Sequence, residues 1–106
     1  MREPIETIYI EENIDVVVNL LKALSNEKRL QIVCILSNGE RSVGELEDIV
    51  GLSQSALSQH LARLRRDGLV KTRREAQTIY YSMDNDETSK LLKSLCDIYF
   101  SGQACA

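Results

Sequence analysis

Residues 52–82, LSQSALSQHLARLRRDGLVKTRREAQTIYYS, contain the change of hydrophobic period that decides the fold. Up to Gly68, Leu57, Leu61 and Leu64 recur at the spacing of one helix face, and Ser53 precedes them as a suitable N-cap. After the glycine the period becomes two, with side chains alternating over residues 70–73 and 79–83. The stretch predicts a helix over 54–67 and then a β-hairpin that bends at residues 75–77.

A short helix is predicted immediately before this one, over residues 43–50. Ser42 and Glu45 have the spacing of a capping box, and Gly51 is placed to end the helix. The few residues between the two helices are the connection expected of a helix-turn-helix. Further upstream, an N-cap at Ser25 or Asn26 predicts a helix to about residue 36, ended by the Ser-Asn-Gly sequence at 37–39. Its apolar residues fill two adjoining faces, so we expect it to be buried over most of its circumference.

Two further helices are predicted near the ends of the chain. Residues 14–24 repeat apolar side chains with a helical period, and Asn13 is a candidate N-cap. Residues 84–86 can cap a last helix, whose apolar side consists of Leu91, Leu92, Leu95 and Tyr99. The order of elements predicts a mainly α-helical fold with a small β-hairpin, a winged helix-turn-helix. We assign residues 13–100 to this domain, 1–12 to an N-terminal extension and 101–106 to a C-terminal tail.

Length and composition limit the class of protein. The chain has 106 residues and a mass of 12.0 kDa, which fits one domain, and its 43% hydrophobic and 27% charged residues are globular values. No apolar run approaches the roughly 20 residues that cross a bilayer. The acidic start is unlike a secretory signal, and an odd number of cysteines favours thiols over a disulfide scaffold. We therefore expect a cytoplasmic protein that does not enter a membrane.

The net charge of −3 conceals an uneven distribution of charges along the chain. Residues 53–83 hold six Lys or Arg against two Asp or Glu, whereas residues 1–15 hold one against five and residues 84–106 two against four. A positive region between acidic ends favours nucleic-acid binding more than the overall charge indicates. The alternative interpretation of the same region is an ordinary solvated run of charges.

The exposed side of the predicted helix 54–67 is the main candidate site. Its first turns carry glutamine and serine, and glutamine can bond adenine through both its amide and its carbonyl group. Arg63, Arg65 and Arg66 follow near the helix end, where contact with phosphates or with the helix dipole is expected. Arg73 and Arg74 make the first strand of the hairpin basic, which suits a wing that follows the DNA backbone or minor groove.

Residues 52–82, together with LKALSNEKRLQIVCIL at 21–36 and SVGEL at 42–46, resemble the ArsR/SmtB family of bacterial repressors. The resemblance covers roughly residues 16–100 and is strongest to metal-independent members, the NolR-like and the HlyU-, BigR- and SqrR-like regulators. It implies a winged helix-turn-helix that dimerises through its first and last helices. It also implies a repressor that binds an inverted-repeat operator as a homodimer.

The resemblance assigns DNA contacts residue by residue to the helix and the wing, namely Gln54, Ser55, Ser58, Gln59, Arg73, Arg74 and Gln77. The partners that it implies are double-stranded operator DNA and a second copy of the chain. A winged-helix module that binds protein without sequence-specific DNA contacts is the alternative function. We expect no enzyme and no cofactor, because paired catalytic carboxylates, a Ser/His/Asp set and a glycine-rich phosphate loop are all missing from the sequence.

No metal site is expected. Metal-sensing members of the family usually carry cysteines in the helix that corresponds to 43–50, or Asp and His pairs in the last helix. This chain has SVGELEDIV at 42–50 and no histidine after His60. Because His60 adjoins the Leu57/Leu61 stripe, packing or phosphate contact is a better interpretation of it than metal ligation.

The cysteines leave two interpretations open. Cys34 matches a cysteine that sulfur-responsive members carry in the second helix, but their partner cysteine follows a tyrosine in the last helix, where this chain has Phe100. A redox or persulfide switch would have to pair Cys34 with Cys96, one helical turn earlier, or with Cys105 in the tail. The alternative is three inert thiols, because a buried cysteine often acts as a small hydrophobic residue.

Overall fold

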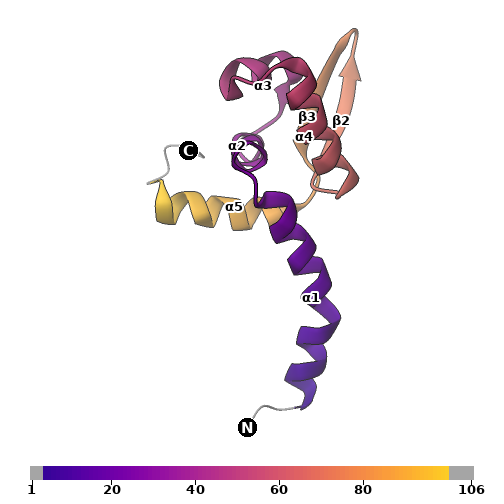
Figure 1. Cartoon of the computed structure of the whole chain (residues 1–106), viewed down its shortest axis with the longest axis vertical. Helices are drawn as coiled ribbons and strands as arrows, with labels where there is room; N and C mark the ends of the chain where they lie inside the picture. The colour runs from indigo at the N-terminus through magenta and orange to yellow at the C-terminus, as the bar shows by residue number, and fades with distance from the viewer. Residues whose placement is uncertain (1–3, 101–106) are drawn as a thin grey trace.

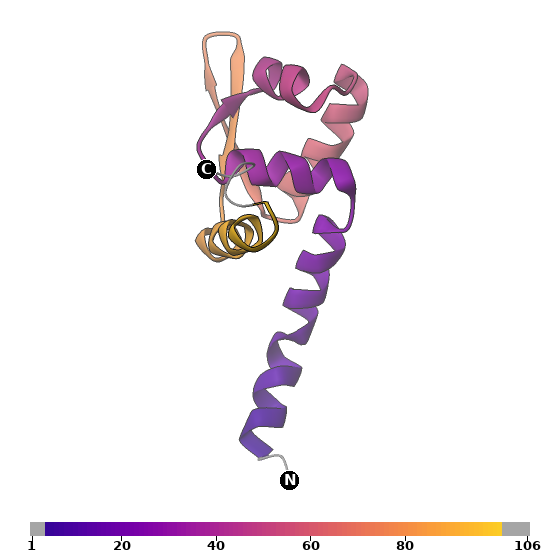
Figure 2. The ribbon, with the colours of Figure 1, turned by 90° about the vertical axis from the view of Figure 1, so that its left-hand side faces the viewer.

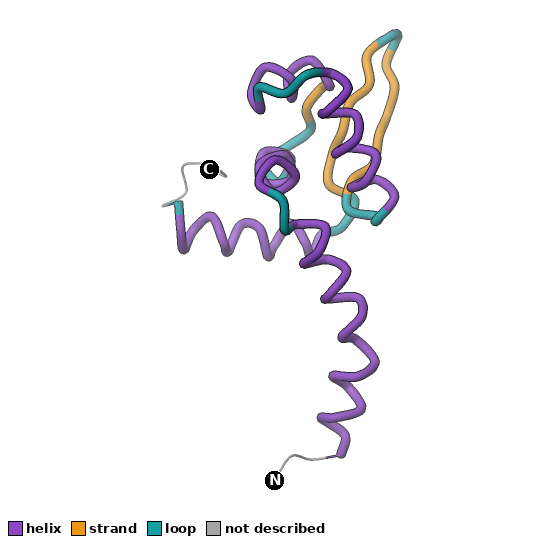
Figure 3. Tube along the Cα trace, viewed as in Figure 1, coloured by secondary structure: helices purple, strands orange, loops and turns teal. Residues whose placement is uncertain are grey.

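The computed structural model describes residues 4–100, and their side chains from residue 11 onward. Along this part of the chain the elements are α1 (Pro4–Leu24), α2 (Glu27–Leu36), β1 (Arg41–Ser42), α3 (Val43–Val50), α4 (Gln54–Arg66), β2 (Val70–Glu75), β3 (Thr78–Met83) and α5 (Asp86–Tyr99). The trace is mostly helical, with one small sheet at its side (Figure 1, Figure 3). The predicted winged helix-turn-helix is confirmed.

Helix α2 is the centre of the core. Asn26 is its N-cap, and the Asn26 side chain accepts hydrogen bonds from the amides of Lys28 and Arg29. The helix contacts α1, α3, α4, α5 and β3, and Figure 1 shows it nearly end-on in the middle of the body. Ile32 and Val33 are fully buried, so the predicted burial over most of its circumference is confirmed.

The helix-turn-helix is built by local capping. Ser42 accepts a hydrogen bond from the Glu45 amide while the Glu45 carboxylate accepts one from the Ser42 amide, which confirms the predicted capping box. Gly51 ends α3 with a φ of 75°, a left-handed conformation that strains other residues. Ser53 then caps α4 by accepting from the amide of Ala56. The two helices meet across this short turn.

The wing is a three-stranded antiparallel sheet in the order β1-β3-β2. β2 and β3 form the predicted hairpin, with Glu75 opposite Thr78 across a two-residue turn. β1 was not predicted, because a strand of two residues is too short to show a period. It pairs Arg41 with Tyr81 and attaches the hairpin to the segment between α2 and α3.

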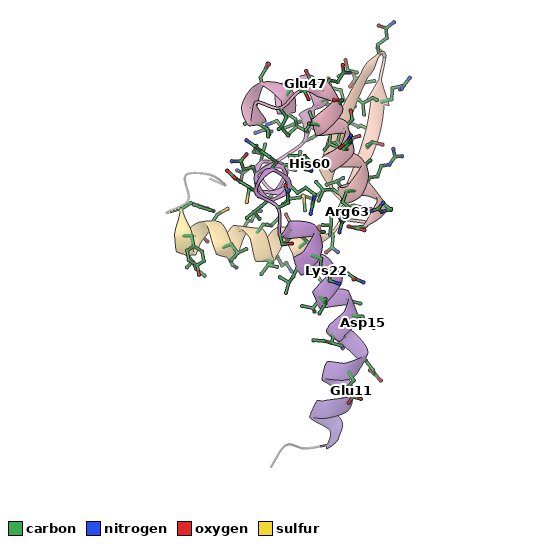
Figure 4. All side chains as sticks on the ribbon, in the orientation of Figure 1. Glu11, Asp15, Lys22, Glu47, His60 and Arg63 are labelled. Atoms are coloured by element: carbon green, nitrogen blue, oxygen red, sulfur yellow. The ribbon has the colours of Figure 1, made fainter. Side chains whose placement is uncertain are left out.

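Helix α1 extends away from the body (Figure 2). The predicted N-cap at Asn13 is wrong, because the helix begins at Pro4 and passes through residue 13 without a break. Proline fits the first turn of a helix, where its missing N–H has no helical partner to lose. The predicted boundary between residues 12 and 13 therefore falls inside α1. Glu11, Asp15 and Lys22 follow one another along the protruding part (Figure 4).

The protruding helix makes the protomer elongated. Its Cα radius of gyration is 15.7 Å, against about 13 Å for a compact chain of this length. In α5, Leu92 and Cys96 face the core, whereas Ile98 and Tyr99 are 70% and 73% exposed, so the predicted apolar side is only partly buried. Within the described residues, no helix has both the length and the apolar character needed to cross a membrane.

Candidate nucleic-acid interface

The exposed face of α4 carries the polar side chains that the sequence singled out. Leu57, Leu61 and Leu64 are buried and hold the helix against the core. The predicted DNA-contacting residues of the first two turns are all exposed on the other side, namely Gln54, Ser55, Ser58 and Gln59. The amides of the first turn have no partner within the helix, which also makes this end attractive to anions. The structure therefore places exposed glutamine and serine side chains beside a weakly positive helix end.

A shallow hollow next to this face collects two arginines from the end of the helix. It has a volume of about 480 Å³ and is lined by Ser58, Ala62, Arg65 and Arg66 of α4 and by Tyr81 of β3. Positions 58, 62 and 65 follow one another at the spacing of a single helix face. Of the three arginines predicted to contact phosphates near the end of this helix, the hollow holds Arg65 and Arg66.

Arg63 has different surroundings from the other predicted site residues. Its Nε donates to Asp67 Oδ2 at 3.0 Å, one helical turn away. It lines a hollow of about 590 Å³ that is shared with Leu20 of α1 and Thr88 of α5. Arg63 therefore lies on the side of α4 that faces the protruding helix, away from the hollow that holds Arg65 and Arg66.

The two arginines of the wing point to opposite faces of the sheet, because neighbouring side chains alternate along a strand. Arg74 lies opposite Ile79 and is on the same face as Tyr81, which lines the hollow beside α4. Arg73 lies opposite Tyr80 on the other face. Gln77 is exposed in the two-residue turn at the wing tip, close along the chain to Arg74.

Arg73 is held by a network of ion pairs. Its Nε and one terminal nitrogen donate to the two oxygens of Glu40 at 2.8 and 2.7 Å, and its other nitrogen donates to Glu75 at 2.9 Å. The guanidinium lies 4.4 Å from the centre of the Tyr80 ring, a cation–π contact. These hydrogen bonds raise the pKa of Arg73 and lower the pKa of Glu40.

His60 is half-buried on α4 (Figure 4). Burial lowers its pKa, and the positive charge of Arg29 on α2 lowers it further. Since its ordinary value is 6.5, the imidazole is neutral at pH 7. Among the residues that the structure describes, there is no group of three His, Cys, Asp or Glu side chains that could hold a metal ion.

The structure places two of the three cysteines in contact. The Sγ atoms of Cys34 in α2 and Cys96 in α5 are 3.8 Å apart in the core. Cys34 is 5% exposed, and this burial raises the pKa of its thiol. It also lines an open hollow of about 490 Å³ between α2, α3 and Phe100. Cys105 lies outside the described residues.

The sequence is similar to known bacterial regulators. Residues 26–72 match the family model of the bacterial regulatory proteins of the arsR family. The transcriptional activator HlyU of Vibrio cholerae is 52% identical over 96 residues, which are 91% of this chain and 89% of HlyU. The nodulation protein NolR of Rhizobium meliloti is 52% identical over 83% of this chain and 72% of NolR. A biofilm growth-associated repressor of Xylella fastidiosa is 43% identical over 85% of this chain and 79% of that protein.

Solved structures share the fold as well as the sequence. Reduced HlyU from Vibrio cholerae superposes with a TM-score of 0.83 at 54% identity, covering 86% of this chain and 96% of HlyU. A homodimeric winged helix-turn-helix DNA-binding domain from Mycobacterium bovis superposes with a TM-score of 0.72 at 29% identity, covering 95% of this chain and 89% of that domain. Identity over most of both chains, with a common fold, shows that this chain is a winged helix-turn-helix regulator of the bacterial arsR family.

Proposed function

We propose that the protein is a transcriptional repressor that binds an inverted-repeat DNA operator as a homodimer. The observation that carries this proposal is the exposed polar face of α4, which continues into the hollow of Arg65 and Arg66 beside the wing. Glutamine and serine on the first two turns would read base edges, while the arginines would bind phosphates. Arg74 and Gln77 of the wing would extend the contact along the backbone.

A second copy of the chain is the partner that the apolar surface fits. Ile14, Val17 and Leu21 repeat along one side of α1 and are 46%, 46% and 54% exposed. Ile98 and Tyr99 expose further apolar surface on α5. A two-fold dimer formed through these helices would place two copies of α4 in successive major grooves, about 34–36 Å apart.

Repression would follow from blocking the access of RNA polymerase to an overlapping promoter. Induction would follow from a change in the spacing of the two recognition helices, since DNA binding needs both half-sites. The protein would act in the cytoplasm, where the chromosome is. We propose no enzymatic step for it.

Selection of bound fragments from a random DNA pool tests the function and also gives the operator. We expect enrichment of an inverted repeat whose half-sites are about one helical turn apart. Gln59→Glu should abolish enrichment, because its carboxylate would face DNA. Gln31→Glu, the same change at an exposed position of α2, should leave it intact. No enrichment with the unaltered protein would contradict the proposal and favour a protein-binding module.

We also propose a thiol switch based on Cys34 and Cys96. Cys34 is a free thiol in the structure, whereas Cys96 is disulfide-bonded. Once Cys96 has been reduced to its thiol, a peroxide would take two electrons from the Cys34–Cys96 pair: one S–S bond forms, the O–O bond breaks, and the two thiol protons leave in two water molecules. The sulfur atoms need to approach by about 2 Å to reach bonding distance. The hollow beside Cys34 gives a small oxidant a way in, while the raised pKa of Cys34 makes the reaction slow at neutral pH.

We propose no role for a metal ion. Zn²⁺ in structural sites strongly favours four nitrogen or sulfur ligands, and the sequence has one histidine and three cysteines far apart in the chain. Adding Zn²⁺ or Ni²⁺ to the protein–operator complex should leave the affinity unchanged. Stoichiometric binding with release of DNA would contradict this expectation.

A further inference from the structure

The wing has a core-facing side and an outer side, and the register assigns each arginine to one of them. Val70 of β2 is buried, and its neighbours on the same face, Tyr81 and Met83 of β3, pack against the core. Arg74 belongs to this inner face, four residues along the strand from Val70. Arg73 belongs to the outer face. Only the inner face is continuous with the hollow beside the recognition helix.

On the outer face, the Arg73 guanidinium is held between the carboxylates of Glu40 and Glu75. All three of its nitrogens donate to carboxylates, and the two-point contact with Glu40 has the geometry that binds arginine most strongly. These contacts use three of the five N–H groups of the guanidinium, and the cluster of Arg73, Glu40 and Glu75 has a net charge of −1. This net negative charge would repel a phosphate that approached the two remaining N–H groups. The network therefore disfavours a direct phosphate contact.

The same network connects parts of the fold that are distant in sequence. Glu40 lies immediately before β1, at one edge of the sheet, while Arg73 lies on β2 at the other edge. The Arg73 side chain crosses the β3 residue Tyr80 to reach Glu40. Because β1 has only two residues, few backbone hydrogen bonds hold the wing at this edge, and the ion pair adds a second attachment.

We infer that Arg73 is a positioning residue, which fixes the angle of the wing through Glu40, and that Arg74 makes the phosphate contact of the wing. This inference rests on the proposed function, since it divides the wing residues of the same DNA-binding site. It differs from the simpler expectation that both arginines bind DNA. It also gives Glu40, a residue outside the helix-turn-helix and the hairpin, a part in operator binding.

The first test compares Arg73→Gln with Arg74→Gln, two neighbours that undergo the same change of charge. The slope of log affinity against log salt should fall by about two units per dimer for Arg74→Gln, because one phosphate contact is lost in each protomer. For Arg73→Gln the slope should stay within about half a unit of the original, while affinity falls about fivefold at every salt concentration. Thermal unfolding of both variants checks that they are folded.

The second test exchanges the charges of the pair. Arg73→Glu alone should weaken operator binding strongly, and adding Glu40→Arg should restore the affinity to within about threefold, because the ion pair forms again in the reverse direction. The inference would be overturned if the slope of log affinity against log salt fell for Arg73→Gln as it does for Arg74→Gln. It would also be overturned if the double variant Arg73→Glu/Glu40→Arg bound the operator as weakly as Arg73→Glu alone. If the unaltered protein shows no salt-dependent DNA binding at all, the proposed function itself fails.

Discussion

Cys34 and Cys96 are 62 residues apart in sequence, yet their sulfur atoms lie 3.8 Å from each other where α2 packs against α5. Cys96 occupies the turn before the position where sulfur-responsive relatives of this family were expected to have their cysteine. The contact shows that the earlier turn of α5 also brings a sulfur atom to Cys34. A crosslink here would join the central helix of the core to a helix of the proposed dimer interface.

After all cysteines have been reduced, peroxide treatment should therefore release operator DNA from the unaltered protein but not from Cys34→Ser or Cys96→Ser. Mass spectrometry should show the loss of two hydrogen atoms per chain and a peptide that links residues 34 and 96. The Cys105→Ser variant is the control and should respond like the unaltered protein. A crosslink from Cys34 to Cys105, or unchanged binding despite a Cys34–Cys96 crosslink, would contradict the proposed switch.

Leu21→Asp should convert the dimer to monomers and weaken operator binding. Leu21 is 54% exposed on the apolar side of α1, and burying a leucine contributes about 1.5–3 kcal/mol. Two such losses per dimer should raise the dissociation constant at least a hundredfold in analytical ultracentrifugation. Ile49→Asp on α3, where the side chain is 55% exposed, is the matched control and should remain dimeric. Monomers with undiminished operator binding would contradict the account.

Ala76→Gly should stabilise the protein. Ala76 has a φ of 57° in the hairpin turn, a left-handed conformation that costs an L-residue about 1–2 kcal/mol. Glycine removes that cost but has more entropy to lose on folding, so the net gain should be about 0.5–1 kcal/mol in urea denaturation. Ala62→Gly, the same substitution inside helix α4, should destabilise by about 1 kcal/mol. Equal losses in both variants would contradict strain at the turn.

The Glu40–Arg73 pair should make stability depend on acid pH. Arg73 holds the pKa of Glu40 below its ordinary value of 4.5, so the folded state favours the charged carboxylate. The stabilisation is present above pH 4.5 and is lost as the pH falls through the lowered pKa. Between about pH 5 and about pH 3, Glu40→Gln should lose less stability than the unaltered protein. If both proteins lost stability equally as the pH fell, the Glu40–Arg73 pair would contribute nothing to the stability of the fold. Glu45, whose pKa is also lowered, is the same in both proteins and cancels.

Local signals account for most of the fold. Ser42 with Glu45, Asn26 and the glycines after α3 and α4 act within a few residues of themselves, so the sequence places these helix ends correctly. The start of α1 was misplaced because Asn13 is a good cap in isolation, and nothing local shows that an earlier turn is already helical. The strand β1 was missed because its pairing partner lies about 40 residues away.

The candidate site could be predicted from the sequence where it depends on local signals, but not where it depends on contacts between distant residues. The exposed residues of α4 follow from helix periodicity around Leu57, Leu61 and Leu64. The different environments of Arg73 and Arg74 could be predicted from the sequence only in part. The alternation of side chains along a strand places the two arginines on opposite faces, but it does not predict that Arg73 contacts Glu40, which is 33 residues away. The contact between Cys34 and Cys96 depends on how two helices pack, which no spacing in the chain specifies.

The most direct test of the central claim is the affinity of Gln59→Ala for the operator, for a set of single-base-pair operator variants, and for random DNA. If α4 reads bases, the variant should lose about 1–3 kcal/mol of discrimination at one base pair in each half-site and should bind random DNA as the unaltered protein does. Ser25→Ala, a change at an exposed residue outside α4, should leave every affinity unchanged. Equal losses by Gln59→Ala on operator and random DNA would contradict base reading by this face.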